Sequence, residues 1–578
     1  MNNKYKDLEP KKTIENIKNF FKSKNLEIIH YVFQSQESST WSCYVKLLSY
    51  NQVILQTCGK GQTEEFALAS GYGEMYERFC NYLNIIFNPI SYNLMIENNY
   101  KKNHYYLDKN EKLLSFQDLK NNKNLFENLK KIFGNENNLE IFTKLISGEK
   151  IIGVPYKNCF NFSQIEYYDP RLLVKLNSSS GMAAGNTIEE ALVQGISEIF
   201  EHQVQELFLK NPPSTLYEIP YEKMNLNNKK IIDNINKQNK KIKIYDLSYN
   251  YNFPVCLAIL YNSFTYNYII NFGSAPILSI AIERTLTELY QNIQNFNHVE
   301  QMPQFPSRLT SWENQMSELY KNTTKANCFP EIFNFSTTNN KNSNRYLQEN
   351  KNYSNKDFLS FYEKICKENN LNLFFWDNSK DNDIKSVHII SPYYNYRNFI
   401  EDFFSKIPSE KKLYILNIAI NYFKIIYEIN YLNQSDKNFL NQLNEINYLT
   451  KEEINFINYI FGGNTSWFYP LSKTVINKGI YNLLKKENCI EEILLNLKNS
   501  LFELPARKYL SLYQYKISNQ YSDEEIYQIF SQLDDKLSLE EISMCNNHDF
   551  LFYKIILEPM KMTYSSNAFM NMVDAYCD

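Results

Sequence analysis

The sequence predicts an α/β (α+β) fold with mixed β-sheets over residues 1–400, followed by an all-helical domain over residues 401–578. Short β-rich runs alternate with longer helical segments before residue 400. Beyond it, nearly every segment has helical periodicity and strand patterns are almost absent. At 578 residues the chain also exceeds the length at which a single hydrophobic core stops growing, so we expect at least two domains.

Individual elements of the first part follow from the spacing of apolar residues. An amphipathic helix is predicted over residues 12–25, and two short strands, 41–48 and 52–58, predict a β-hairpin. The stretch from about 334 to 355 is rich in Asn, Ser and Thr, which is typical of an exposed insertion. Further β-rich runs predict strands at residues 150–156, 254–261 and 267–273.

Composition excludes several classes of function. Hydrophobic residues make up 43% of the chain and aromatic residues 15%, which is typical of a globular protein. The net charge of -3 predicts no direct nucleic-acid binding and no attraction to an anionic membrane. The sequence has no signal peptide and no apolar run of about 18 residues, so we expect a cytoplasmic protein.

The cysteines and histidines argue against a zinc site. The ten cysteines include no C-x-x-C pair, and the six histidines include no H-E-x-x-H motif. Because thiol and imidazole ligands are not clustered, we expect any metal chemistry to use carboxylates.

An internal repeat carries conspicuous carboxylates. Residues 61–78 align with residues 185–202 without gaps at a constant offset of 124, and eight of the 18 positions are identical. The identical pairs are Gly61/Gly185, Thr63/Thr187, Glu65/Glu189, Ala67/Ala191, Leu68/Leu192, Gly71/Gly195, Glu74/Glu198 and Glu77/Glu201. The Thr is typical of a helix start, and the Ala, Gly and last two Glu of each copy lie on one helical face.

Small residues on the same face as glutamates predict close packing against another backbone. A third segment, residues 275–292, matches more faintly and keeps Ala281 and Glu288 in register, with Arg284 between them. If the three helices converge, their carboxylates repel one another by several kcal/mol unless cations lie between them. The carboxylates concerned are those of Glu74, Glu77, Glu198, Glu201 and Glu288.

Magnesium suits such a site, because it binds through a few carboxylates and completes its shell with water and phosphate oxygens. The implied ligand is a nucleotide polyphosphate, held directly by Arg284 and lysines. A solvated helix face is the alternative interpretation of any single Glu pair, but the repetition favours a metal site. The triplet at residues 59–61 is not a P-loop, since it lacks the spaced first glycine and a Ser or Thr after the lysine.

At these residues the chain resembles the YcaO family. The family motif S-G-x-A-A-G-x-T-x-x-E-A-x-x-x-G-x-x-E-x-x-E-R is seen here as SSGMAAGNTIEEALVQGISEIFEH, at residues 179–202. The segments GKGQTEEFALASGYGEMYER and AIERTLTELYQ are similar to stretches of the family's stand-alone branch, and the similarity covers roughly residues 1–400. The resemblance implies a YcaO-type domain that binds ATP and Mg²⁺ without a Walker motif.

The resemblance also implies roles for individual residues. Magnesium-ligand positions of the family match Glu74, Glu77, Glu190, Glu198, Glu201 and Glu288. Nucleotide-contacting positions match Lys6, Thr13, Ala183, Asn186, Gln194, Ala281 and Arg284. Glu198, Glu201 and Arg284 are the expected catalytic residues. One position departs from the motif, because His202 stands where the family has an arginine that could clamp a phosphate.

The implied activity is phosphorylation of a backbone amide oxygen, with ATP cleaved to ADP and phosphate or to AMP. The resemblance implies a peptide or ribosomal-protein substrate. The stand-alone branch implies an accessory factor in β-methylthiolation of a small-subunit ribosomal protein with the radical-SAM enzyme RimO. It also implies a homodimer formed through the helical domain.

Two other functions stay open. One is a nucleotide-binding scaffold without chemistry of its own, which the change at His202 fits equally well. The other is a thioamide- or azoline-forming enzyme of a peptide natural-product pathway. The final residues, NAFMNMVDAYCD, lack the P-x-P-x-P tail of many azoline-forming members, which disfavours the azoline reaction.

Overall fold

The computed structural model describes residues 6–49, 52–85, 110–147, 151–177, 179–237, 239–291, 336–339, 345–349, 351–392 and 407–416, with residues 404, 456, 522, 524, 525 and 528. Most of the predicted helical domain, residues 401–578, lies outside this part, so that domain stays a prediction. Within the described ranges, no helix is both long and apolar enough to cross a lipid bilayer.

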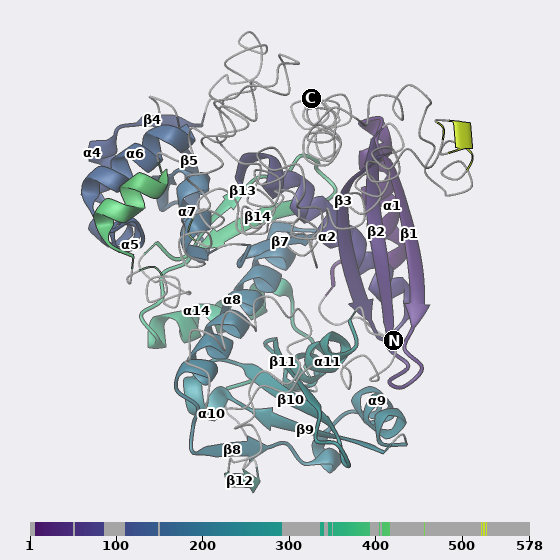
Figure 1. Cartoon of the computed structure of the whole chain (residues 1–578). Coiled ribbons are helices and arrows are strands. Elements are labelled where there is room, and N and C mark those ends of the chain that lie inside the picture. Colours follow the sequence, from purple (N-terminus) through teal and green to yellow (C-terminus); the bar gives the residue numbers. More distant parts are fainter. Residues whose placement is uncertain are drawn as a thin grey trace.

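The first sheet is antiparallel, with the order β1-β2-β3 (Figure 1). Its strands are β1 (Glu27–Gln34), β2 (Trp41–Ser49) and β3 (Gln52–Gly61). Helices α1 (Pro10–Ser23) and α2 (Glu64–Ile85) pack on it, and their aromatic side chains meet edge to face, as Phe20 does with Tyr76. The predicted N-terminal helix and the β2–β3 hairpin are therefore confirmed.

A second sheet lies against the other side of α2. Its strands run in the order β4 (Lys112–Leu114), β5 (Ile151–Asn158), β13 (Phe374–Asp377), β14 (Lys385–Ile390) and β7 (Met182–Gly185), and β6 (Ile165–Tyr168) pairs with β5 outside this path. The helices of this region are α4 (Phe116–Asn121), α5 (Lys123–Phe133), α6 (Glu136–Ser147) and α7 (Pro170–Asn177).

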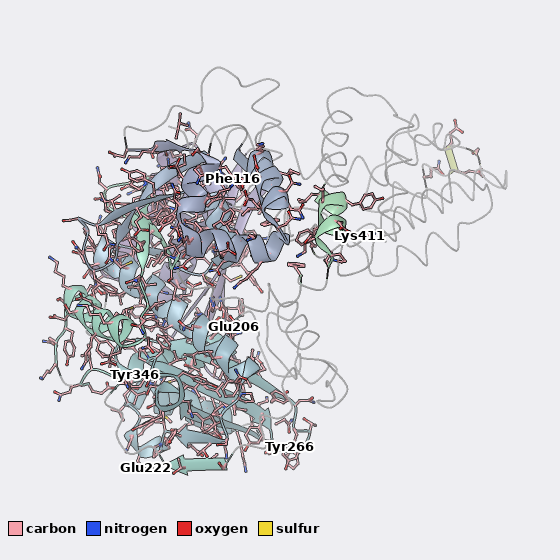
Figure 2. The ribbon with its side chains drawn as sticks, turned by 90° about the vertical axis from the view of Figure 1, so that its left-hand side faces the viewer. Phe116, Glu206, Glu222, Tyr266, Tyr346 and Lys411 are labelled. Atoms are coloured by element: carbon pink, nitrogen blue, oxygen red, sulfur yellow. The ribbon has the colours of Figure 1, made fainter. Side chains whose placement is uncertain are left out.

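The core of this region also includes chain beyond residue 400. Phe404, Ile407 and Ile415 are buried in the same cluster as side chains of α5, α6 and α7. Asn138 of α6 donates a hydrogen bond to the backbone oxygen of Ser409 at 2.8 Å. Figure 2 shows the segment that carries Lys411 beside these helices.

The third sheet has the order β11-β10-β9-β8-β12 and is antiparallel except for the β8–β12 pair. Its strands are β8 (Thr215–Glu218), β9 (Lys240–Asp246), β10 (Val255–Asn262), β11 (Tyr268–Ser274) and β12 (Ser336–Asn339). Around it lie α8 (Ile188–Lys210), η1 (Tyr221–Lys223), α9 (Leu226–Asn236), α10 (Ser248–Tyr251), α11 (Leu278–Leu289) and α14 (Asn355–Glu368). The strands predicted at residues 150–156, 254–261 and 267–273 are β5, β10 and β11.

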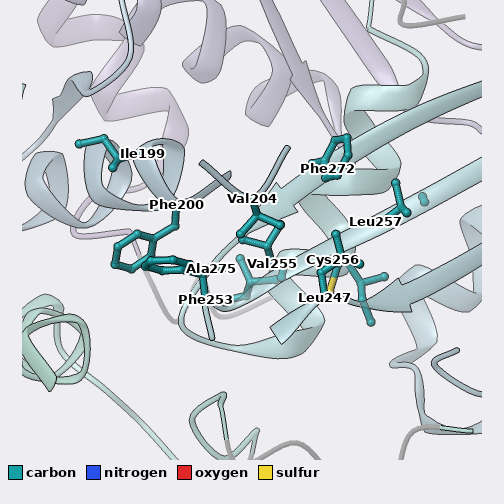
Figure 3. Close-up of a cluster of buried hydrophobic side chains, with 14 of the residues drawn as sticks. Ile199, Phe200, Val204, Leu247, Phe253, Val255, Cys256, Leu257, Phe272 and Ala275 are labelled. Atoms are coloured by element: carbon teal, nitrogen blue, oxygen red, sulfur yellow. The ribbon is translucent and has the colours of Figure 1, made fainter. Parts of the chain in front are cut away.

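Helix α8 lies between the second and third sheets. It contacts β7 and β14 on one side and β10 and β11 on the other. Figure 3 shows Phe200 and Val204 of α8 within the buried cluster that also holds Phe253 and Val255, and the rings of Phe200 and Phe253 are 4.8 Å apart. This burial on two sides explains why α8 is mostly apolar outside its row of glutamates.

The segment from 334 to 355 contributes more structure than an exposed insertion would. Strand β12 (Ser336–Asn339) pairs in parallel with β8, although residues 336–338 are exposed. Tyr346 packs against the main core and donates a hydrogen bond to Asp246 at 3.4 Å. These contacts do not follow from the sequence, because the few apolar residues of this segment lie scattered among many Asn, Ser and Thr residues.

Three strand-then-helix units form the centre of the molecule: β3–α2, β7–α8 and β11–α11. The contacts between them follow a cycle, since α2 packs on β7, α8 packs on β11 and α11 packs on β3. The faint third copy of the repeat is therefore a real structural counterpart of the first two. At a constant offset of 214 from the first copy, Ala67 corresponds to Ala281 and Glu74 to Glu288.

Close approach of strand and helix backbones explains the small residues. A Cβ at Gly59 on β3 would lie 2.0 Å from the backbone oxygen of Ala67 and 2.3 Å from the nitrogen of Gly71. A Cβ at Gly273 on β11 would meet the corresponding atoms of α11, the oxygen of Ala281 at 2.7 Å and the nitrogen of Thr285 at 2.6 Å. The prediction that this helix face packs tightly against another backbone is confirmed.

A buried ion pair fixes the first sheet to the third. Glu37, in the β1–β2 turn, pairs with Lys240 of β9, and its other oxygen accepts a hydrogen bond from Tyr290 at 3.0 Å. The side chains of Glu37 and Lys240 are only 4% and 7% exposed, so solvent screens their attraction little. This link holds the β1–β2 turn against β9 and the end of α11.

Two alanine substitutions in α2 test the close approach. In Gly71→Ala, the new Cβ would lie 2.7 Å from Sγ of Cys43, so we expect a loss of about 1–3 kcal/mol in the free energy of unfolding. Gly73→Ala, two residues along the same helix, meets no atom within 4 Å and should be neutral or stabilising by up to about 1 kcal/mol. Urea denaturation measures both, and an equal gain in both variants would show that helix propensity, rather than packing, governs these positions.

Candidate functional site

Arg78 lies among the glutamates of α2. Its Nη1 atom is 3.1 Å from Oε1 of Glu77, and its Nη2 atom is 3.4 Å from Oε1 of Glu74. Nη1 also donates to Sδ of Met182, 3.7 Å away on β7, so the guanidinium reaches the strand that precedes α8. The Glu77 side chain is only 12% exposed, so neighbouring protein groups, rather than water, must stabilise its negative charge.

Burial and like charges raise the pKa values of two glutamates. Desolvation raises the pKa of Glu77 well above its ordinary value, Arg78 opposes this, and the charges of Glu198 and Glu74 raise the pKa further. Desolvation also raises the pKa of Glu198 to about 7, again against Arg78, with added repulsion from Glu201 and Glu74. The structure therefore brings four predicted glutamates of α2 and α8 into one electrostatic cluster, in which Arg78 is the leading counter-charge.

The start of α8 explains why its polar residues share one face. Thr187 caps the helix by accepting a hydrogen bond from the backbone nitrogen of Glu190 at 3.1 Å. From there Glu190, Gln194, Glu198 and Glu201 follow at spacings of four, four and three residues, which keeps them on one side of the helix.

His202 occupies the position where the family motif has arginine. Its Nδ1 atom is 2.6 Å from Oγ of Ser180, in the turn before β7. One ring nitrogen is therefore engaged by a protein hydroxyl. The imidazole cannot form the two parallel hydrogen bonds that a guanidinium offers to a phosphate.

The third helix contributes a cation and an ion pair. Arg284 donates from Nη1 to the backbone oxygen of Ser274 at 2.8 Å, and its charge acts on Glu198 by lowering the pKa of that carboxyl. Glu288 forms an ion pair with Lys60 of β3, and Lys60 also donates to Oε1 of Gln291 at 3.4 Å. These contacts close the cycle between α11 and β3.

The N-terminal segment binds the start of α8. Lys6 Nζ is 3.1 Å from Oε1 of Glu190, and the backbone nitrogen of Asp7 donates to Oε2 at 3.1 Å. Asn186 donates to both oxygens, at 3.3 and 3.0 Å, and accepts a hydrogen bond from Thr13 at 2.9 Å. The structure thus brings Lys6 and Thr13 of the N-terminal segment to Asn186 and Glu190, which lie 173 or more positions later in the sequence.

These contacts control the charge of Glu190. Burial raises its pKa, but the charge of Lys6 and hydrogen bonds from Asp7 and Asn186 outweigh burial, so the pKa is lowered overall. Both oxygens of the carboxylate are engaged by these donors. We call the contacts of Lys6, Asp7 and Asn186 with Glu190 the N-terminal clamp, because they hold the N-terminal segment against α8.

The two predicted alanines and the glutamine lie on the same units. Ala183 is buried on β7, where it pairs with Val387 of β14, and Ala281 is buried on α11. Gln194 is half-buried, one turn after Glu190. Buried alanines contribute backbone atoms and close contact, so they shape a site without binding a charge.

The donor chemistry of the cluster fits Mg²⁺. Carboxylate oxygens from α2 and α8 are hard ligands, and the raised pKa values of Glu77 and Glu198 indicate unmet demand for positive charge. Among the described residues, no three His, Cys, Asp or Glu side chains stand close enough together to hold an ion in their present positions. Cationic side chains lie there instead, with Arg78 beside Glu77 and Lys60 beside Glu288.

Sequence reasoning missed three residues of the site. They are Arg78, which the sequence shows only as the last residue of the first repeat, Lys60, which lies in the triplet that is not a P-loop, and Asp7. The signal for Lys60 is its place at the end of β3, directly before the first repeat. The Arg78–Glu74 pair has the i, i+4 spacing of a local helix pair, which the sequence does show. The contacts of Asp7 with Glu190 and of Arg78 with Met182 depend on tertiary approach, which no local pattern reports.

The raised pKa of Glu198 predicts a pH-dependent effect of Glu198→Gln. A carboxyl whose pKa is about 7 in the folded state, above its unfolded value, weakens the fold as the pH rises through 7. Glutamine resembles the protonated acid, so the variant should differ little from the parent at pH 5 and be more stable by about 1–3 kcal/mol at pH 8.

Urea denaturation at the two pH values measures the difference. Glu363→Gln on α14 is the matched control, since Glu363 forms a largely exposed pair with Lys367. A Glu198→Gln effect of the same size at pH 5 and pH 8 would contradict the prediction.

Comparisons with known proteins agree with the sequence resemblance. The family model described as YcaO cyclodehydratase, ATP- and Mg²⁺-binding, matches residues 58–395. Ribosomal protein S12 methylthiotransferase accessory factor YcaO of Escherichia coli is 31% identical over 273 residues, 45% of each chain. An uncharacterized protein of Haemophilus influenzae is 31% identical over 262 residues, 44% of this chain and 43% of that protein. The matched region thus spans less than half the length of either relative.

Solved structures show similarity at low identity. YcaO from Methanopyrus kandleri bound with AMPPCP and Mg²⁺ has a TM-score of 0.41 and 13% identity, over 68% of this chain and 93% of that one. A heterocyclase in complex with substrate and cofactor has a TM-score of 0.44 and 15% identity, over 67% of this chain and 52% of that one. Since the family model matches more than half of the sequence, the chain belongs to the YcaO family, and residues 58–395 are its ATP- and Mg²⁺-binding domain.

Proposed function

We propose that this chain is an ATP- and Mg²⁺-dependent enzyme that phosphorylates the oxygen of a backbone amide. The observation that carries the proposal is the cluster in which Glu77 and Glu198, from two copies of one repeat, share Arg78 as a counter-charge. Buried carboxylates at such density destabilise a fold, so their retention points to a ligand that supplies positive charge.

Each group of residues has a role in this proposal. ATP supplies the phosphoryl group, and Mg²⁺ offsets the charge that develops on the phosphate oxygens. Glu74, Glu77, Glu198 and Glu201 would hold the metal. Arg284, fixed by its hydrogen bond to Ser274, points positive charge at the same cluster and would orient the phosphates.

The N-terminal clamp would close the nucleotide end of the site. Lys6 and Asn186 lie at the first turn of α8, where backbone N–H groups and the helix dipole favour anions. The burial of Glu77 and Glu198 keeps bulk water away from the reacting groups, which favours transfer to an amide over hydrolysis.

The biological role proposed is that of an accessory factor in β-methylthiolation of a small-subunit ribosomal protein with RimO. The name of the Escherichia coli relative, which refers to the ribosomal protein S12 methylthiotransferase, supports this role. A peptide or ribosomal protein would then be the substrate, and a cytoplasmic homodimer the working form.

Calorimetry of ATP binding tests the first half of the proposal. The chain should bind ATP in the presence of Mg²⁺, and Glu198→Gln with Glu201→Gln should lose at least about ten-fold in affinity, because two of the proposed metal ligands lose their charge. The matched control is Glu363→Gln with Glu368→Gln on α14, whose carboxylates pair with Lys367 and Arg345. Equal affinity of both double variants would exclude the carboxylate site.

A second candidate is a nucleotide-binding scaffold that assists RimO without chemistry. The Ser180–His202 hydrogen bond favours it, since that imidazole is already engaged where the motif has a phosphate-reaching arginine. His202→Arg distinguishes the two functions. An enzyme limited by this position should release phosphate faster in step with substrate modification, by roughly ten-fold or more, whereas a scaffold should release none with either residue.

A further inference from the structure

We infer that Arg78 is the counter-ion that a divalent metal must displace from Glu74 and Glu77, so that metal and nucleotide bind this chain together and neither binds well alone. The inference rests on the proposed function, because it concerns the same carboxylates. It adds that the displacement of Arg78 couples the binding of the metal to the binding of the nucleotide.

The geometry of Arg78 differs from that of a permanent ion pair. Arg171 shows what a permanent pair looks like here: its Nε and Nη2 atoms lie 2.9 and 2.7 Å from the two oxygens of Asp169, and Asp169 is fully buried. Arg78 instead divides its guanidinium between two carboxylates, with single contacts of 3.1 Å to Glu77 and 3.4 Å to Glu74, and it also reaches the sulfur atom of Met182. Such contacts are individually easier to exchange than a closed bidentate pair.

The guanidinium and a metal ion would compete for the same oxygens. Oε1 of Glu74 and Oε1 of Glu77 are both within reach of Arg78, and both are proposed metal ligands. Two cations cannot share these oxygens without strong repulsion at short range. A metal that binds here must therefore move Arg78 away.

The displaced guanidinium then needs another anion. Glu198 and Glu201 would be committed to the metal, and Glu288 already pairs with Lys60. The phosphates of a nucleotide are the remaining anionic partner in this site. Nucleotide binding thus favours the release of Arg78 and metal binding, and by linkage the metal favours nucleotide binding to the same degree.

Binding of Mn²⁺ without any nucleotide tests the exchange. We would measure free Mn²⁺ by electron paramagnetic resonance at pH 8 for the full chain, Arg78→Met, Arg78→Lys and Arg345→Met. Arg345 is the matched control because it pairs with Glu368 at 2.5 Å on the surface of the molecule. Arg78→Met should bind Mn²⁺ at least about ten-fold more tightly than the parent, since the competing cation is gone. Arg78→Lys keeps the charge and should stay close to the parent.

The coupling between ligands provides the second measurement. In the parent, Mn²⁺ should tighten ATP binding by more than about ten-fold, and in Arg78→Met this factor should shrink to the part that direct contacts between the metal and the phosphate oxygens supply. If Arg78→Met binds Mn²⁺ no better than the parent while the parent still binds ATP with metal, the exchange is wrong and the proposed function survives. If the parent binds ATP under no condition, the proposed function fails as well. Should Arg78→Met not fold, the prediction transfers to Arg78→Gln, which is polar and uncharged.

Discussion

Close contact between each strand and the helix that follows it is the constraint on which the site depends. Gly59 lets β3 approach α2 at Ala67, and Gly273 lets β11 approach α11 at Ala281. In the middle unit, Ala183 takes the place of the strand glycine, and Gly195 on α8 provides the space instead. This close packing fixes each helix relative to its strand. As a result, Glu74, Glu198 and Glu288 occupy corresponding positions in the three units.

The same close packing creates an electrostatic problem. Carboxylates at the centre of three packed units lose hydration, and this loss is the main cause of the raised pKa values of Glu77 and Glu198. A different cation lies beside a glutamate of each helix: Arg78 beside Glu77 of α2, Lys6 beside Glu190 of α8 and Lys60 beside Glu288 of α11. These cations offset the negative charge only in part, since the pKa values of Glu77 and Glu198 stay raised. A nucleotide with its metal would therefore replace existing ion pairs.

Much of this arrangement could be predicted from the sequence, and the limits have physical causes. Two copies of the repeat were visible because they keep both the small residues and the glutamates. The third copy was faint because its strand glycine, Gly273, precedes the segment that was compared, and because Gln291 stands where the other copies have glutamate. The clamp on Glu190 could not be derived locally, because it joins residues 6 and 7 to a helix that starts 180 residues later. The strand at Ser336–Asn339 was missed because edge pairing of polar residues leaves no hydrophobic period.

The cyclic order of contacts also bears on how such a chain could arise. Each helix packs on the strand of the next unit: α2 on β7, α8 on β11 and α11 on β3. These head-to-tail contacts form a closed ring of three units. Three separate copies of one strand-and-helix peptide would make the same contacts as a cyclic trimer, with a common centre to which each copy donates one glutamate. Copies joined in one chain can diverge separately, which is consistent with Arg78 and His202 at the same position of the first two copies.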